Sequence, residues 1–275
     1  TTCMDLNQTN SIYDWYRESA IGNPDVKWET VTKMNVGLDY NLFKGLIAGS
    51  VEVFQDDRTD ILVSGGERSV PGYFGGTPPT VNLGRVRATG YELELRVNKQ
   101  FRNSLRLWGN FNMTHAENVI LKKDDPELLP NYQKQAGYAI GQYRSHIDAG
   151  FLNTWDEVYG SPAHETNDAQ RLPGDYYIVD FDGNGVIDSK DSAPYGYTGT
   201  PENTYNATIG LEYKGFSAFV QLYGVTNVTR DVPLHSFGSK LNTVYNVGEW
   251  WGANTPNADV VVPAFNRTPS YNEAT

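Results

Sequence analysis

Residues 180–191 carry side chains whose types and spacing fit the chemistry of a hard metal cation. The stretch reads Asp-Phe-Asp-Gly-Asn-Gly-Val-Ile-Asp-Ser-Lys-Asp. In a twelve-residue calcium loop, oxygen ligands stand at positions 1, 3, 5, 7, 9 and 12, and a glycine at position 6 allows a sharp turn. The spacing therefore predicts six ligands. They are the side chains of Asp180, Asp182, Asn184, Asp188 and Asp191 and the backbone carbonyl of Val186.

The last position of this loop predicts weak binding. Position 12 is usually a glutamate that binds calcium through both oxygens, whereas this sequence has the shorter Asp191. We therefore expect a structural Ca²⁺ site with the affinity of extracellular modules, roughly 10⁻⁴ to 10⁻³ M. Mg²⁺ fits less well because it demands a tighter octahedron and gives up water reluctantly. The alternative is a solvated acidic turn that only resembles a cation loop.

Other metal-binding or catalytic patterns are not found in the sequence. The four histidines, His115, His146, His164 and His235, are far apart and form no zinc-binding set, so we expect surface or loop residues. There is no Gly-x-Ser-x-Gly elbow and no glycine loop that would cradle a phosphate. We therefore predict that the chain is not an enzyme.

Composition and charge narrow the class of protein further. With 18 Tyr, 27 Gly and a mean hydropathy of −0.51, the 275 residues favour many β-strands joined by polar loops. The net charge of −11 argues against nucleic acid as a partner. Cys3 is the single cysteine, which excludes an internal disulfide. No apolar run reaches the roughly 18 residues of a membrane helix, but the strands of a membrane barrel are only half apolar.

Polar and apolar residues alternate in six stretches, which predicts six antiparallel strands. The stretches are 33–42, 47–54, 91–98, 105–114, 205–213 and 216–223. Tight or short turns near Lys44, Gln100 and Gly215 alternate with long connections at 64–81 and 115–203. Short turns at one end and long loops at the other are typical of an outer-membrane barrel, whose long loops are extracellular.

The predicted fold class is therefore all-β: part of a large antiparallel transmembrane β-barrel with long extracellular loops. Tyrosines close the apolar faces at Tyr40, Tyr91, Tyr205 and Tyr213, as an interfacial girdle would. The opposite faces carry more charge than a protein core accepts, which favours lipid over a soluble antiparallel sandwich. Since six strands cannot close a channel, we expect the remaining strands to lie outside these residues.

Four segments resemble a known family. Residues 20–29, 82–95 and 174–188 occur in the order found in the C-terminal part of SusC/RagA-like TonB-dependent transporters of Bacteroidota. Residues 249–257 resemble that family's late Trp-Thr-Pro segment but depart from it at Gly252 and Ala253. The resemblance implies that residues 1–275 are the C-terminal portion of a plugged barrel of about 22 strands. Six strands and extracellular loops would be present, and the plug domain and remaining strands absent.

The resemblance also implies a function and partners. The leading hypothesis is an outer-membrane nutrient importer in membrane lipid, which takes up oligosaccharides or peptides. Its energy would come from TonB, through the missing N-terminal part, and a SusD-like surface lipoprotein would capture the substrate. One alternative is a secreted, Ca²⁺-stabilised carbohydrate-binding or adhesive β-domain. Another keeps the barrel but carries a siderophore or cobalamin.

Loop aromatic residues leave two interpretations open. They are Tyr73, Phe74, Trp155, Tyr159, Trp250 and Trp251. Exposed rings could stack on sugars or anchor a partner protein. The alternative is that each ring packs its own loop against a neighbouring loop.

Overall fold

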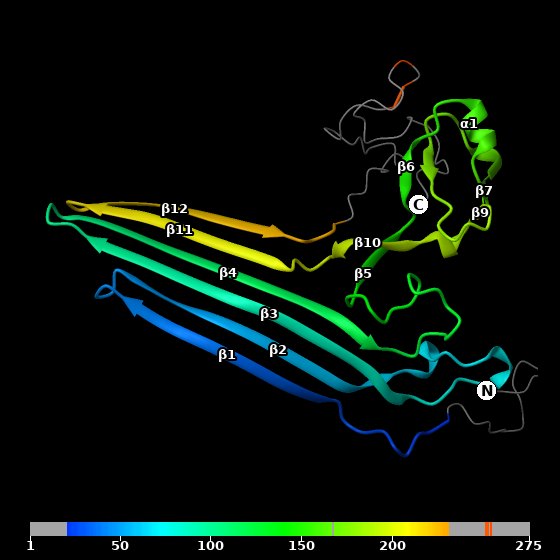
Figure 1. Cartoon of the computed structure of the whole chain (residues 1–275), viewed down its shortest axis with the longest axis horizontal. Coiled ribbons are helices and arrows are strands. Elements are labelled where there is room, and N and C mark those ends of the chain that lie inside the picture. The colour runs from blue at the N-terminus through cyan, green and yellow to red at the C-terminus, as the bar shows by residue number, and fades with distance from the viewer. Residues whose placement is uncertain (1–20, 167, 231–250, 253, 255–275) are drawn as a thin grey trace, which may run out of the picture.

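One antiparallel sheet dominates the structure, a computed structural model that describes residues 21–230 apart from 167, together with 251, 252 and 254 (Figure 1). Its six strands pair in the order β1 (Thr30–Leu42), β2 (Ile47–Val63), β3 (Val81–Gln100), β4 (Leu105–Lys122), β11 (Asn203–Tyr213) and β12 (Phe216–Thr226). Every predicted strand is present, so the all-β prediction is confirmed. Cys3, His235, Trp250 and most of 249–257 lie outside the described residues.

The connections between strands differ at the two ends of the sheet. Residues 43–46, 101–104 and 214–215 join neighbouring strands at one end, on the left in Figure 1. Residues 64–80 and 123–202 make the long connections at the other end. The predicted asymmetry is therefore confirmed. The second long connection begins later than the predicted His115, because β4 continues to Lys122.

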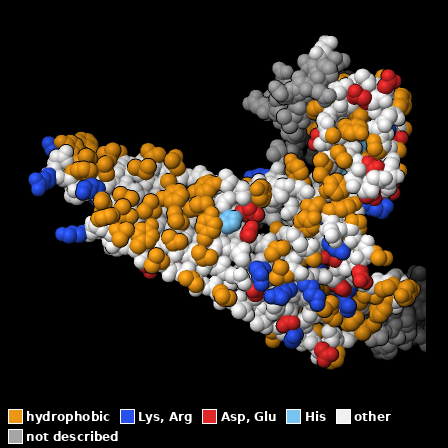
Figure 2. Space-filling model, in the orientation of Figure 1, with side chains coloured by type: hydrophobic (Ala, Val, Ile, Leu, Met, Phe, Trp, Pro, Cys, Tyr) orange, Lys and Arg blue, Asp and Glu red, His pale blue; other side chains and the backbone are white. Residues whose placement is uncertain are grey.

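The outer face of the sheet is apolar and exposed. The side chains of Val36, Leu38 and Val53 are 75%, 67% and 57% exposed, and Val220 on β12 is 62% exposed. Figure 2 shows hydrophobic side chains gathered over the strands, with charged side chains nearer the loop end and at the tips of the short turns. The inner face is polar and carries ion pairs such as Arg106–Glu212, at 3.3 Å between β4 and β11. A sheet with one apolar exposed face fits the wall of a lipid-embedded barrel.

Glycines opposite aromatic residues fix the packing on both faces of the sheet. Directly paired positions are Gly49 with Tyr40, Gly90 with Phe54, Gly210 with Trp108 and Gly224 with Tyr205. A Cβ on each of these glycines would come within 2.4–2.9 Å of the facing ring or hydroxyl. Each aromatic ring thus covers a stretch of backbone that a side chain would otherwise occupy.

The loop at residues 64–80 and the cap, defined as residues 123–202, contain only short elements. The loop has two 3₁₀ helices, η1 (Gly65–Glu67) and η2 (Gly72–Phe74). The cap contains β5 (Gln142–Ser145), β6 (Asp148–Phe151), α1 (Trp155–Gly160), β7 (Ala163–His164), η3 (Asp168–Gln170), β8 (Tyr176–Ile178), β9 (Val186–Ile187), η4 (Ser189–Asp191) and β10 (Ala193–Thr198). In the described part of the chain, no helix has the length and apolar character needed to cross a membrane.

Most of the buried hydrophobic core of the described residues lies in the cap. Strands pair there as β5 with β10, β6 with β8 and, in parallel, β7 with β9. Apart from Val63 at the end of β2, the buried hydrophobic side chains of the described residues all belong to the cap: Leu152, Val158, Ile178, Ile187 and Ala193. The cap therefore packs as a small folded unit of its own, while the apolar side chains of the sheet face outward.

Candidate cation-binding loop

The predicted cation loop lies within the cap, between β8 and β10, and includes β9 and η4 (Figure 1). The side chain of Ile187 attaches the loop to the hydrophobic core of the cap. This side chain is 4% exposed and packs with Ile178 and Tyr176 of β8. The apolar residue at position 8 of the loop is thus the point at which the loop joins the core of the cap, while Asp182, Gly183 and Asn184 of the first half are exposed.

The carboxylate of Asp180 organises the first half of the loop. It accepts hydrogen bonds from the backbone amides of Gly183, Asn184 and Gly185, at 2.8, 3.2 and 2.7 Å. Gly183 and Gly185 have φ values of +73° and +88°, a region in which side chains other than glycine are strained. Both glycines are therefore required by the backbone path that wraps around Asp180.

Asp191 organises the second half of the loop from a fully buried position, with 0% exposure. Its Oδ1 accepts hydrogen bonds from the amides of Phe181 and Asp182, at 2.7 and 3.3 Å. Its Oδ2 accepts one from the amide of Asp188, at 2.7 Å. Position 12 thus ties the end of the loop to its beginning, and a buried carboxylate with amide donors is a stable arrangement.

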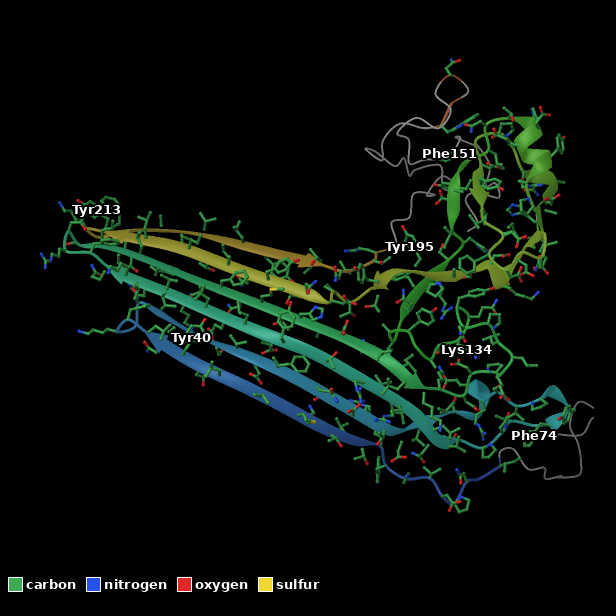
Figure 3. The ribbon with its side chains drawn as sticks, in the orientation of Figure 1. Tyr40, Phe74, Lys134, Phe151, Tyr195 and Tyr213 are labelled. Carbon is green, nitrogen blue, oxygen red and sulfur yellow. The ribbon has the colours of Figure 1, made fainter. Side chains whose placement is uncertain are left out.

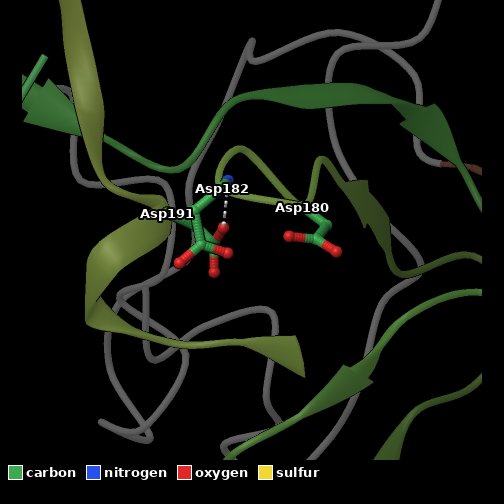
Figure 4. Close-up of side chains that lie close together, drawn as sticks. All are labelled: Asp180, Asp182 and Asp191. Carbon is green, nitrogen blue, oxygen red and sulfur yellow. Dashed lines mark hydrogen bonds between the residues drawn. The ribbon is translucent and has the colours of Figure 1, made fainter. Parts of the chain in front are cut away.

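Three of the predicted ligands converge. Oxygens of Asp180, Asp182 and Asp191 all lie within 4.8 Å of one another, and Figure 4 shows these carboxylates turned toward a common space. The donor atoms are all carboxylate oxygens, which hard cations such as Ca²⁺ prefer. In the part of the chain that the structure describes, these three are the only group of three or more His, Cys, Asp or Glu side chains that are close enough together to bind one ion.

The other three predicted ligands are placed differently. Asp188 caps η4, accepts from the amide of Lys190 at 2.6 Å and pairs with its ammonium group at 3.0 Å. The hydrogen bond from that amide, followed by the one from the Lys190 side chain, lowers the pKa of Asp188. The Oδ1 of Asn184 accepts from the amide of Val186 at 2.8 Å, and Val186 lies in β9. Asp188 is thus held by a lysine rather than by the carboxylate cluster.

Contacts that the sequence did not reveal attach the loop to the rest of the cap. The carbonyl of Lys190 accepts from the hydroxyl of Tyr132 and from Nε2 of Gln133, at 2.8 and 2.9 Å. His146 bonds the carbonyl of Asp188 through Nε2 at 2.9 Å. The rings of Tyr132 and Phe181 lie 4.7 Å apart. No periodicity or spacing marks Tyr132, Gln133 or His146, so a pattern search could not have found them.

A buried polar cluster lies beside β7. Arg171 is 7% exposed, pairs with Asp168 at 2.9 Å and donates to the carbonyl of Pro162 at 3.1 Å. His164 is 8% exposed, and burial, with the charge of Arg171, lowers its pKa to about 4. Burial raises the pKa of Asp175, which is 1% exposed and accepts from the amide of Leu172 at 2.8 Å. His164 is therefore a buried residue and not a surface one.

The remaining sequence-predicted residues occupy the sheet and the outer surface. His115 on β4 stacks on Tyr91 with ring centroids 5.0 Å apart. Tyr73 and Tyr159 are 91% and 79% exposed, and the ring of Tyr159 stacks on Trp155 of the same helix with centroids 5.9 Å apart. Trp251 donates from its indole nitrogen to Asn153 of the cap at 3.0 Å. Figure 3 shows Phe74, Lys134, Phe151 and Tyr195 at the loop end, away from Tyr40 and Tyr213.

Comparison with known proteins defines the class. The family model described as "TonB dependent receptor-like, beta-barrel" matches residues 6–273. The chain therefore belongs to this family, which is one of outer-membrane receptors and not of enzymes. Because members of this family are outer-membrane proteins, the outer membrane is its location.

Individual relatives agree with the family. TonB-dependent receptor P3 of Formosa agariphila is 27% identical over 260 residues, which cover 88% of this chain and 25% of that protein. TonB-dependent receptor SusC of Bacteroides thetaiotaomicron is 28% identical over 188 residues, which cover 63% of this chain and 17% of that protein. The chain thus spans a quarter or less of the length of these relatives.

A solved structure supports the fold. The structure of the RagAB peptide importer in the "open-open" state matches with a TM-score of 0.61 and 18% identity, over 92% of this chain and 28% of that chain. The resemblance to SusC/RagA-like transporters inferred from the sequence is confirmed.

Proposed function

We propose that this chain is part of an outer-membrane importer that takes up oligosaccharides or peptides with energy supplied through TonB. The observation that carries the proposal is the continuous apolar outer face of a six-stranded sheet in a member of a receptor barrel family. Val36, Leu38 and Val220 are more than half exposed on this face. In water such a face would favour aggregation, whereas membrane hydrocarbon makes it favourable. In this proposal residues 1–275 form the C-terminal portion of the barrel.

The proposed partner is a SusD-like lipoprotein that covers the loop end of the barrel. Two features support it. The relatives include proteins named SusC and RagAB, and rings such as Tyr73 and Tyr159 stand exposed at this end. Aromatic side chains are enriched where proteins bind one another. The substrate class is supported only by the sequence resemblance and by the structural likeness to RagAB, which is a peptide importer.

Uptake by whole cells tests the proposal. The gene for the complete receptor is deleted, and uptake of labelled oligosaccharides and peptides is compared in the deletion strain, the complemented strain and a strain without TonB. We expect one class of substrate to enter only when both the receptor and TonB are present. Uptake that is the same in all strains would overturn the import function.

The orientation has its own test. Protease added to intact cells should cut within residues 123–202 and spare the turns at 43–46 and 214–215, which lie at the opposite end of the sheet. Cleavage that appears only after the outer membrane is opened would reverse the topology.

We also propose that the 180–191 loop binds Ca²⁺ in a structural role. Asp180, Asp182 and Asp191 would supply the carboxylates, with Asn184 and the Val186 carbonyl completing the set. Asp188 is engaged with Lys190, which suits position 9, a position that often acts through a water molecule. By neutralising the clustered carboxylates, the cation would hold this part of the cap in one shape and present a fixed surface to the lipoprotein or the substrate.

Calcium titration of the purified full-length receptor tests the cation site. Asp182→Asn removes one charge from the cluster and keeps a similar shape, and Asp156→Asn is the matched control, because Asp156 is an exposed acidic residue of the same cap outside the loop. We expect millimolar Ca²⁺ to slow proteolysis of the loop in the wild type and in the control, and to do so at least about tenfold less effectively in Asp182→Asn. If Ca²⁺ protects the wild type and both variants equally, or protects none of them, the loop is a solvated turn and not a cation site.

A further inference from the structure

A cavity of about 800 Å³ lies where the loop ends of β1–β4 meet the beginning of the cap. Its floor is the inner face of the sheet. Asp56, Ala88 and Asn118 are paired across β2, β3 and β4, and all three line the cavity. Arg58, Val86 and Ile120 form the next row of paired residues, and all three also line the cavity. Because side chains alternate between the two faces of a strand, both rows lie on the polar inner face of the sheet. The cavity therefore opens toward the interior of the barrel.

The cavity wall combines aliphatic and positively charged side chains. Ile61, Leu62, Val63, Val86 and Ile120 provide the aliphatic surface. The charged lining residues are the cations Arg58, Arg85, Lys122, Lys123 and Arg144 and the acids Asp56 and Glu67. This excess of cations is notable in a chain whose net charge is −11. A positively charged cavity in an otherwise acidic protein concentrates an electric field that attracts anions.

Ion pairs compensate some of these charges. Arg58 pairs with Glu29 at 3.3 Å, Lys123 pairs with Glu67 at 3.8 Å, and Arg85 pairs with Asp57 at 3.8 Å. Lys33 neutralises Asp56 from β1 at 3.4 Å. These pairs leave no carboxylate of the cavity wall without a cation.

Two cations of the wall remain uncompensated. Lys122 is exposed at the end of β4 and has no ion pair with any described residue. Arg144 donates to the carbonyls of Tyr132 and Lys134 and lies 5.1 Å from the centre of the Tyr138 ring. These contacts fix the position of the Arg144 guanidinium but do not neutralise its charge. Lys122 and Arg144 therefore supply the surplus positive charge of the cavity.

We propose that this cavity is a subsite for a carboxylate group of the imported oligomer, a proposal that rests on the import function above. The exposed ammonium group of Lys122 binds the carboxylate directly, the fixed charge of Arg144 adds to the attraction, and the aliphatic side chains pack against the apolar part of the same unit. Two oligomers share this chemistry: an oligosaccharide of uronic acids and an acidic peptide. The subsite would make the importer prefer acidic oligomers to neutral ones of the same size.

Binding to the purified full-length receptor tests this preference. The probes are tetragalacturonate and its methyl ester, and an acetylated, amidated Leu-Glu-Leu-Glu peptide and its Gln counterpart. We expect the acidic member of one pair to bind more tightly than its neutral partner by about tenfold, since a hydrogen bond to a charged group contributes that much or more. The preference should shrink as salt is raised, because salt screens exposed charges. The pair that shows it identifies the source of the carboxylate.

Lys122→Gln removes the proposed contact without breaking a hydrogen bond or ion pair with any described residue. It should abolish the preference by weakening binding of the acidic probe about tenfold and leave the neutral probe unchanged. Lys99→Gln is the matched control, since Lys99 is an exposed lysine of β3 near the short turns and does not line the cavity. The proposal is overturned if neither acidic probe binds more tightly than its partner, or if Lys122→Gln keeps the preference. TonB-dependent uptake of neutral oligomers would then still stand.

Discussion

Tyr40 lies directly opposite Gly49 in the pairing of β1 with β2, and its hydroxyl passes over that glycine to donate a hydrogen bond to the carbonyl of Glu94 on β3, at 3.0 Å. A Cβ at position 49 would lie 1.9 Å from the Glu94 carbonyl oxygen and 2.6 Å from the Tyr40 hydroxyl. One aromatic side chain thus connects three strands, and only a glycine between them leaves room for it.

Gly49→Ala should therefore destabilise the barrel. The clash is with backbone, which cannot move aside as a flexible side chain could, so we expect a loss of about 1–3 kcal/mol. Gly37→Ala is the control, because Gly37 is also a strand glycine and its nearest neighbours would lie at an ordinary 3.8 Å. The measurement is the temperature at which the full-length receptor loses its folded, faster-migrating form on a gel. Equal temperatures for the two variants would show that the sheet absorbs the methyl group.

The sheet could be predicted from the sequence because its alternation is a local pattern. The strand ends could not. β2 continues to Val63 through Asp56 and Asp57, and β3 begins at Val81, ten positions before the predicted Tyr91. Beyond the apolar band neither face has to be hydrophobic, so the alternation disappears while the backbone ladder continues. Hydrogen bonding between strands, which leaves no period in the sequence, determines where they end.

The cation loop was recognisable because ligand spacing is also local. The sequence could not show that Lys190 holds Asp188, since the same spacing is compatible with either a free or a paired carboxylate. Nor could it show that His164 and Arg171 are buried, because the cap has no repeating pattern and its core is assembled from segments far apart in the chain. Such contacts depend on tertiary packing, which overrides local preference.

Asp191→Ala should open the cation loop even without calcium. The substitution leaves the amides of Phe181, Asp182 and Asp188 without their acceptor, and each hydrogen bond to a charged group contributes about 1.5–3 kcal/mol. Hydrogen exchange of residues 180–191 in calcium-free buffer should become at least tenfold faster. Asp156→Asn, outside the loop, should leave it unchanged. Unaltered exchange in Asp191→Ala would mean that the three hydrogen bonds do not hold the loop.

Gly185→Ala should weaken the loop through the backbone alone. A Cβ at this position meets nothing within 4 Å, but φ is +88°, and the left-handed region costs other residues about 1–2 kcal/mol. Gly160→Ala is the control, since its Cβ also meets nothing and its φ is not positive. We expect faster proteolysis of the loop and weaker Ca²⁺ protection for Gly185→Ala only. The same behaviour in both variants would exclude backbone strain as the cause.

Acid should loosen the cap through His164. Burial, followed by the charge of Arg171, lowers its pKa from 6.5 to about 4, so the unfolded cap binds a proton between these pH values and the folded cap does not. The contribution of neutral His164 to stability is therefore complete above pH 6.5 and is lost as the pH falls toward 4. Asp175 acts in the opposite sense, because burial raises its pKa above 3.8 and its protonation favours the folded cap at the acidic end.

Hydrogen exchange of residues 146–178 at pH 7 and pH 5, corrected for intrinsic rates, measures this effect. In the wild type, protection of the cap should fall between the two values. His164→Gln cannot take up the proton, so its protection should differ less between pH 7 and pH 5, whatever its absolute stability. His115→Gln is the control, since His115 lies on β4 outside the cap, and it should behave as the wild type does. If His164→Gln loses as much protection at pH 5 as the wild type, another group must cause the loosening.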